Sequence, residues 1–118
     1  MKTENNNLIL DLSFKFALKV IDFCEALEMQ KKFSLARQLF RAGTSIGANI
    51  CEAQRAESRS DFIHKLKISD KESEETKYWL QLCKFSNKYP DCDELIADLL
   101  AIKRILGKII YTSRMNHS

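Results

Sequence analysis

Apolar residues recur along most of the chain at intervals of three and four positions, which is the period of an α-helix. Four such stretches, separated by short polar breaks, predict helices over residues 8–31, 34–56, 60–86 and 92–114. Candidate N-terminal caps mark the later breaks: Ser34, the Ser58–Asp61 capping box and the Asp91–Glu94 pair. Long helices with short connections favour antiparallel neighbours, so we predict an all-α, up-down-up-down four-helix bundle.

The helix predicted over residues 8–31 carries two apolar stripes. The stripe that defines it as amphipathic consists of Leu10, Phe14, Ala17, Ile21 and Cys24. The second stripe consists of Phe16, Val20, Phe23 and Leu27. Together they cover more than half of the helix circumference, which a single bundle partner cannot bury. We therefore predict that the second stripe contributes to self-association.

The segment from Arg41 to Gln54 contains glycine, serine, threonine and asparagine, which helix interiors disfavour. Pairing the second and third helices as antiparallel neighbours places large residues against small ones, for example Ile46 against Ser69 or Ser73. The flank of the same seam is polar, with Arg41 opposite Glu75, Ser45 opposite Glu72 and Glu52 opposite Lys65. We predict an interhelical polar line made of Arg41, Ser45, Asn49, Glu52, Lys65, Glu72 and Glu75.

Gly43 and Gly47 have the small-x-x-x-small spacing that lets two helix backbones approach closely. Each glycine lowers helix stability relative to alanine, so we expect a close contact as compensation. The alternative is that both are tolerated surface residues, and the neighbour belongs either to the same chain or to another subunit. The candidate oligomer interface consists of Phe16, Val20, Phe23, Leu27, Gly43, Gly47 and Trp79.

The 118 residues suit one domain over 1–118, with residues 1–7 as a frayed terminus. Three glycines and one proline are too few for an all-β fold with regular turns. The four cysteines show no C-x-x-C spacing, and we expect a reduced, cytoplasmic protein without a membrane span. The net charge of +3 permits binding to a polyanion without requiring it.

Basic residues gather near the second turn and in the second half of the last helix. Cations near helix C-termini also complement the helix dipole, which is the alternative explanation. The nucleic-acid-binding candidates are Arg55, Arg59, Lys67, Lys71, Lys103, Arg104 and Lys108. His64 and the cysteines lack the partners that a metal site or a catalytic thiol needs, so we predict no catalytic residue, metal or cofactor.

Three ordered motifs carry a family resemblance. They read Arg41-x-x-x-Ser45-Ile46-x-x-Asn49-Ile50-x-Glu52-Ala53, then Ser60-Asp61-Phe62-Ile63-x-Lys65-Leu66-x-Ile68, then Lys71-Glu72-x-x-Glu75-Thr76-x-Tyr78-Trp79-Leu80. The chain resembles the bacterial four-helix-bundle family encoded in intervening sequences of large-subunit ribosomal RNA genes, also labelled ribosomal-protein-like. The resemblance implies a homopentameric ring without known enzymatic activity. It also implies kinship with the accessory variability protein of diversity-generating retroelements, which binds a reverse transcriptase and nucleic acid.

The leading hypothesis is a non-enzymatic homo-oligomer, a pentamer by resemblance, that acts as an RNA-associated adaptor or scaffold. Its partners would be its own copies and structured RNA or a nucleic-acid enzyme, with no membrane and no small-molecule substrate. The first alternative is a protein-binding scaffold whose basic residues are only solvated. A second alternative is a small enzyme that uses His64 or a cysteine.

Overall fold

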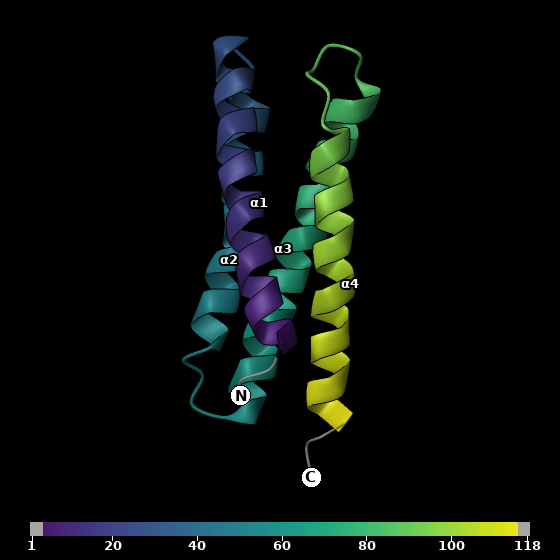
Figure 1. The fold of residues 1–118 in the computed structure, drawn as a ribbon. Helices are drawn as coiled ribbons and strands as arrows, with labels where there is room; N and C mark the ends of the chain where they lie inside the picture. The colour runs from purple at the N-terminus through teal and green to yellow at the C-terminus, as the bar shows by residue number, and fades with distance from the viewer. Residues whose placement is uncertain (1–3, 116–118) are drawn as a thin grey trace.

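The computed structural model describes residues 4–115 of the chain, with side chains from residue 6 onward, as four helices joined by short turns (Figure 1). The helices are α1 Glu4–Met29, α2 Phe33–Ala53, α3 Arg59–Phe85 and α4 Asp93–Met115. The predicted all-α class is confirmed, and every helix end lies within four residues of its predicted position.

The first turn of α1 differs from the prediction. A frayed terminus over residues 1–7 is wrong for residues 4–7, which are helical. Asn6 is only 2% exposed and Ile9 only 1%, so burial of this turn outweighs the weak helix propensity of consecutive asparagines. Residues 1–3 lie outside the described residues.

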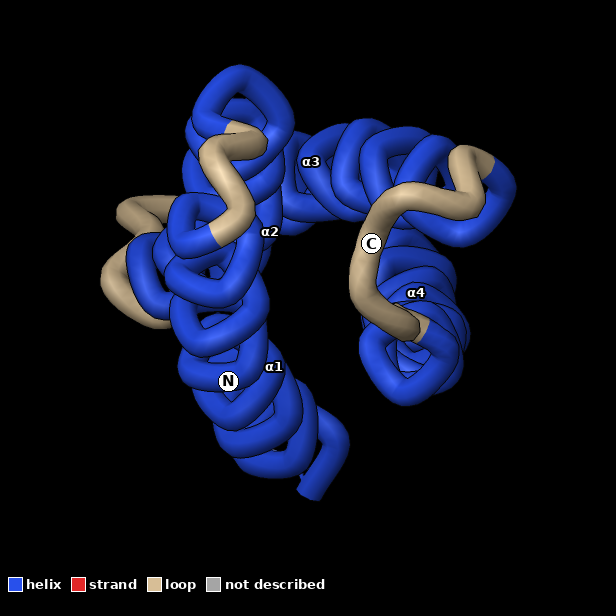
Figure 2. Tube along the Cα trace, turned by 90° about the horizontal axis from the view of Figure 1, so that it is seen from above, coloured by secondary structure: helices blue, strands red, loops and turns tan. Residues whose placement is uncertain are grey.

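Each helix packs antiparallel against its neighbours in the chain, and α4 closes the bundle against α1. Figure 2, which looks down the helices, shows that α1, α2, α3 and α4 are arranged around the bundle in the order of the chain. In each pair, early residues of one helix contact late residues of the other. Examples are Cys24 with Ala36 (3.4 Å), Ile46 with Ser69 (2.9 Å), Arg59 with Ser113 (3.1 Å) and Lys19 with Asp98 (2.7 Å).

The second apolar stripe of α1 does not have the predicted role in self-association. Phe16, Val20 and Leu27 are at most 1% exposed and belong to the core of their own chain, so they are not interface residues. Phe23 is half-buried and packs against the same core. Phe14, on the other stripe, is 65% exposed. The stripe assigned to self-association therefore holds the protomer together. On the other stripe, which we call the outward stripe, Phe14 faces solvent, whereas Leu10 packs against the core and Cys24 is buried in it.

The helix starts depend on local side-chain chemistry. At α3, Ser58 Oγ accepts from the amide of Asp61 at 3.0 Å, as the capping box predicts. At α2, the predicted cap Ser34 is wrong, because the helix begins at Phe33 and Lys32 occupies the cap position without a side-chain bond. Before α4, Asp91 Oδ1 accepts from the amide of Asp93 at 3.2 Å.

The end of α1 is a Schellman turn. The amide of Lys32 donates to the Leu27 carbonyl at 2.9 Å and that of Lys31 to the Glu28 carbonyl at 2.8 Å. Lys31 occupies the left-handed position of this turn, with a φ of 63°. Glycine is the residue that adopts this conformation without a Cβ penalty.

Replacing Lys31 with glycine is therefore expected to raise the free energy of unfolding by about 0.5–1 kcal/mol, because relief of the left-handed strain exceeds glycine's extra entropy in the unfolded chain. Urea titration followed by circular dichroism measures the change. Lys15→Gly, at an exposed position inside α1, is the control and should lower stability by about 1 kcal/mol. An equal loss of stability in both variants would contradict the proposal that the left-handed conformation of Lys31 is strained.

Candidate nucleic-acid interface

The basic residues of the bundle fall into two groups, those paired with carboxylates and those without an ion pair. Lys19 lies 2.6 Å from Glu94 and 2.7 Å from Asp98, and Lys84 lies 3.1 Å from Asp93. These pairs join neighbouring helices. Within residues 6–115, the second group consists of Lys31, Lys32, Arg37, Arg55, Arg59, Lys67, Lys71, Lys77, Lys88, Arg104, Lys108 and Arg114. Seven of them lie in the α2–α3 turn, the first half of α3 and the second half of α4, and we call these seven the unpaired cations: Arg55, Arg59, Lys67, Lys71, Arg104, Lys108 and Arg114.

The unpaired cations lie between the middle of the bundle and the end that holds the α2–α3 turn. Because α3 and α4 are antiparallel, the first half of α3 lies beside the second half of α4, and the end of α2 leads into α3. Lys67 and Lys71 are one helical turn apart on α3, and so are Arg104 and Lys108 on α4. Each pair therefore shares one helix face, and no ion pair neutralises its charges, so these charges stay available to an anionic ligand.

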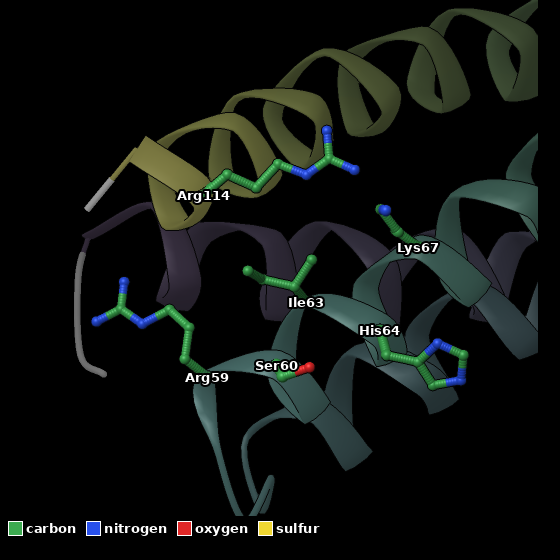
Figure 3. A pocket seen from close by; sticks show the side chains of 6 residues that line it. All are labelled: Arg59, Ser60, Ile63, His64, Lys67 and Arg114. Carbon is green, nitrogen blue, oxygen red and sulfur yellow. The ribbon is translucent and has the colours of Figure 1, made fainter. Parts of the chain in front are cut away.

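A hollow of about 360 Å³ lies between the start of α3 and the end of α4 within this region. Figure 3 shows Arg59 and Arg114 reaching from different helices on either side of Ile63. Ser60, His64 and Lys67 complete the lining, and no described carboxylate belongs to it. Arg59 is held in place because its guanidinium donates to the carbonyl of Ser113 at 3.1 Å. This basic hollow can accept a phosphate group without displacing an internal ion pair.

Lys103 was predicted as a nucleic-acid contact, and the structure places it elsewhere. Its ammonium group contacts Glu74, donates to Ser73 Oγ at 3.2 Å and lies 3.5 Å from Asp70. The side chain is only 18% exposed. The hydrogen bond from Lys103 also lowers the pKa of Glu74. Lys103 therefore joins α4 to α3 and is not a free surface cation.

The predicted polar line centres on Arg41. Its guanidinium donates a hydrogen bond to Glu75 and lies 3.2 Å from Glu72 Oε1. The hydrogen bond from Arg41 lowers the pKa of Glu75. Trp79 is half-buried, and its indole donates to Glu75 Oε2 at 3.1 Å, so this side chain forms part of an intrachain network.

The other members of the polar line divide between interhelical and local bonds. Lys65 Nζ lies 3.1 Å from Glu52 Oε1, across the α2–α3 seam. Ser45 bonds the carbonyl of Arg41 in its own helix and not Glu72, so that predicted pair is wrong. Asn49 likewise donates to the carbonyl of Ser45 at 2.8 Å. Helix carbonyls are the nearer acceptors for short side chains on one face.

Gly43 and Gly47 lie against α1 of the same chain. A Cβ added at Gly43 would lie 3.0 Å from both Cγ atoms of Val20, and one at Gly47 would lie 3.2 Å from Ser13 Oγ. The expected close contact exists, and it is intramolecular. Assigning these two glycines to an oligomer interface is therefore wrong, since α1 already covers them.

An apolar groove between α1 and α2 was missed from the sequence. It has a volume of about 430 Å³, and Ile21, Cys24, Phe33, Ala36, Phe40, Glu25, Glu28 and Arg37 line it. Phe33 is 51% exposed and Phe40 46%, and the exposed Phe14 and Leu18 extend the apolar surface along α1. The first apolar stripe of the helix over residues 8–31 was the available signal, but it was used only to define that helix as amphipathic.

Three of the four cysteines, Cys24, Cys83 and Cys92, are buried and poorly reactive. Burial raises the pKa of Cys24 to about 11 and that of Cys83 to about 12, and it also raises the pKa of Cys92. These thiols are therefore protonated at neutral pH and are poor nucleophiles. Among the described residues, no cluster of three or more His, Cys, Asp or Glu side chains is placed to hold a metal ion.

None of the described helices is both long and apolar enough to cross a membrane. Together, the helix order and the interhelical contacts define a small antiparallel four-helix-bundle protein. The chain belongs to the 23S rRNA-intervening sequence protein family, which it matches over residues 5–108. This agrees with the resemblance found in the sequence motifs.

A solved structure supports the same assignment. The crystal structure of a protein of unknown function from the S23 ribosomal protein family of Bacteroides thetaiotaomicron has a TM-score of 0.85 and 40% sequence identity to this chain. The match covers 91% of this chain and 98% of the other one. No curated protein is significantly similar to the sequence.

Proposed function

We propose that the protein is a non-enzymatic, cytoplasmic homo-oligomer that binds structured RNA and acts as an adaptor or scaffold. The observation that carries this proposal is the basic hollow between α3 and α4 and the unpaired cations near it. Arg59, Lys67 and Arg114 line the hollow together, and no described ion pair neutralises them. Phosphate neutralisation by such cations is the main source of affinity for nucleic acid.

The family adds support for RNA as the ligand. Its description connects it with intervening sequences of 23S ribosomal RNA. The basic hollow between α3 and α4 offers Arg59, Lys67 and Arg114 to a phosphate, without a lining carboxylate among the described residues. Helical structure in the RNA would bring several phosphates to the rigid faces of α3 and α4 at once.

Self-association is supported by the exposed apolar surface of α1 and α2. Phe14, Leu18, Phe33 and Phe40 are 46–65% exposed and adjoin the α1–α2 groove. A surface of this kind marks an interaction site in most proteins. In a closed ring, a pentamer in this proposal, each copy would repeat the unpaired cations and increase their combined attraction for RNA.

RNA binding is tested with an RNA hairpin at increasing salt concentrations. We expect measurable affinity at low salt that falls linearly on logarithmic axes, with a slope of about 0.7–0.9 per phosphate neutralised. The double variant Arg59→Glu with Lys67→Glu should weaken binding by at least about tenfold and make the slope shallower. Fluorescence anisotropy measures both quantities.

The matched control is Lys31→Glu with Lys88→Glu, which makes the same change in net charge at exposed positions in two other turns. It should leave the affinity within about twofold, since a charge more than one Debye length away is largely screened. Equal losses in both variants would contradict a localised interface. No binding by the unmodified protein at low salt would overturn RNA as the ligand.

A protein-binding scaffold is the second candidate, and the α1–α2 groove favours it. Its lining is mostly apolar and also contains Glu25, Glu28 and Arg37, which suits an apolar peptide segment that carries charged side chains of both signs. The mass measured by light scattering first shows whether the protein self-associates, in which case other copies of the chain could cover this groove. A mass that stays at the monomer value of 13.7 kDa at micromolar concentration would contradict self-association.

A further inference from the structure

Gly107 differs from the other two glycines of the bundle. A Cβ added at this position would meet nothing within 4 Å, whereas Gly43 and Gly47 are in close contact with α1. A glycine inside a helix lowers stability relative to alanine, and at Gly107 no packing contact accounts for it. Its effect on the surface is to leave one position of α4 without a side chain.

Tyr111 lies one helical turn after Gly107 and is 65% exposed. Residues four apart share a helix face, so the open position at Gly107 adjoins the phenol ring. The described ring contacts involve Tyr78 with Trp79 and Lys32 with Tyr89, and Tyr111 takes part in neither. One face of α4 thus presents an aromatic ring beside a gap.

Unpaired cations surround this ring on α4. Lys108 and Arg114 lie three residues before and after Tyr111, and Arg104 lies two turns before it on nearly the same face. An exposed aromatic ring among cations is the arrangement by which proteins hold single-stranded nucleic acid. The ring stacks on a base while the cations neutralise the adjoining phosphates.

We infer that Tyr111 is a stacking platform for an unpaired base of the bound RNA, and that Gly107 leaves room for that base against the helix. This inference rests on the proposed function and specifies its ligand. Bases inside a duplex are stacked on one another, so the ligand must contain an unpaired nucleotide in a loop or bulge. Lys108 and Arg114 would contact the phosphates on either side of it.

The test compares an RNA hairpin with a fully paired duplex of the same stem. Tyr111→Ala is expected to weaken hairpin binding at least fivefold and to leave duplex binding within twofold. Tyr111→Phe keeps the ring and should retain hairpin affinity. The salt slope should be unchanged in both variants, because neither removes a cation.

Gly107→Ala separates binding from folding. It should raise the melting temperature, since alanine favours a helix and the added Cβ meets no atom. If Gly107 clears space for a base, the same variant should weaken hairpin binding while duplex binding stays the same. A loss of affinity in a more stable protein is not a consequence of unfolding.

Three results would overturn the inference. If Tyr111→Ala leaves hairpin affinity unchanged while the unmodified protein binds both RNAs, the stacking role fails and the proposed function stands. If Tyr111→Ala lowers the mass in light scattering and not the RNA affinity, Tyr111 contacts another copy, together with the exposed Leu100 and Met115. If the unmodified protein binds neither RNA, the proposed function fails as well.

Discussion

Replacing Phe16 with alanine is expected to lower the free energy of unfolding by about 3–5 kcal/mol, whereas the same replacement at Phe14 should change the stability of the protomer by less than about 0.5 kcal/mol. The two phenylalanines are two positions apart on α1. Phe16 is 1% exposed inside the core, and Phe14 is 65% exposed on the outward stripe. The pair therefore tests which stripe of α1 the fold buries.

Urea unfolding at two protein concentrations measures both effects. The loss from Phe16→Ala should be the same at both concentrations, because it arises inside one chain. A loss from Phe14→Ala should appear mainly as weaker self-association, so it should depend on protein concentration. Similar concentration-independent losses at both positions would contradict the orientation of α1 in the structure.

Replacing Gly43 with alanine is expected to lower the free energy of unfolding by about 1–3 kcal/mol, even though alanine is the better helix former. The added Cβ would lie 3.0 Å from both Cγ atoms of Val20. Rotation of the valine does not relieve the clash, because both methyl groups are equally close and a β-branched side chain is stiff. α1 and α2 would have to separate slightly, which loosens the packing of the buried core around them.

A double-mutant cycle isolates this contact. Gly43→Ala introduced into a Val20→Ala background should be neutral or stabilising, because the space that the new methyl group needs is then available. Gly107→Ala is the matched control for helix propensity and should raise stability by about 0.5–1 kcal/mol. If Gly43→Ala were as stabilising as Gly107→Ala, the close approach of α1 and α2 would be contradicted.

The number, class and approximate ends of the helices could be predicted because the apolar period is strong along the whole chain. The face of α1 that enters the core was predicted wrongly, although the sequence contains a signal for it. The inward stripe continues from Ile9 to Leu27, whereas the outward stripe runs into Glu25 and Glu28. A stripe interrupted by charges is the poorer candidate for burial, and this criterion would have separated the two.

The candidate interface shows a different limit of sequence information. Lys67 and Lys103 are both basic residues on predicted helix faces, and composition does not distinguish them. Lys103 is bonded to α3 because the rotation and register of α4 bring it beside Asp70 and Glu74, and Lys67 has no such neighbour. The register between two helices is a property of their packing, so only the folded bundle reveals which cations are left for a ligand.

The arrangement of the four thiols has a practical consequence for measuring local motion. Cys51 is exposed on α2, while Cys24, Cys83 and Cys92 are buried. A maleimide dye should therefore modify one thiol at once and the other three only as quickly as the surrounding helices separate. Mass spectrometry over time would measure the rate at which each buried thiol is modified. That rate gives the free energy of local opening around each thiol, without any change to the sequence.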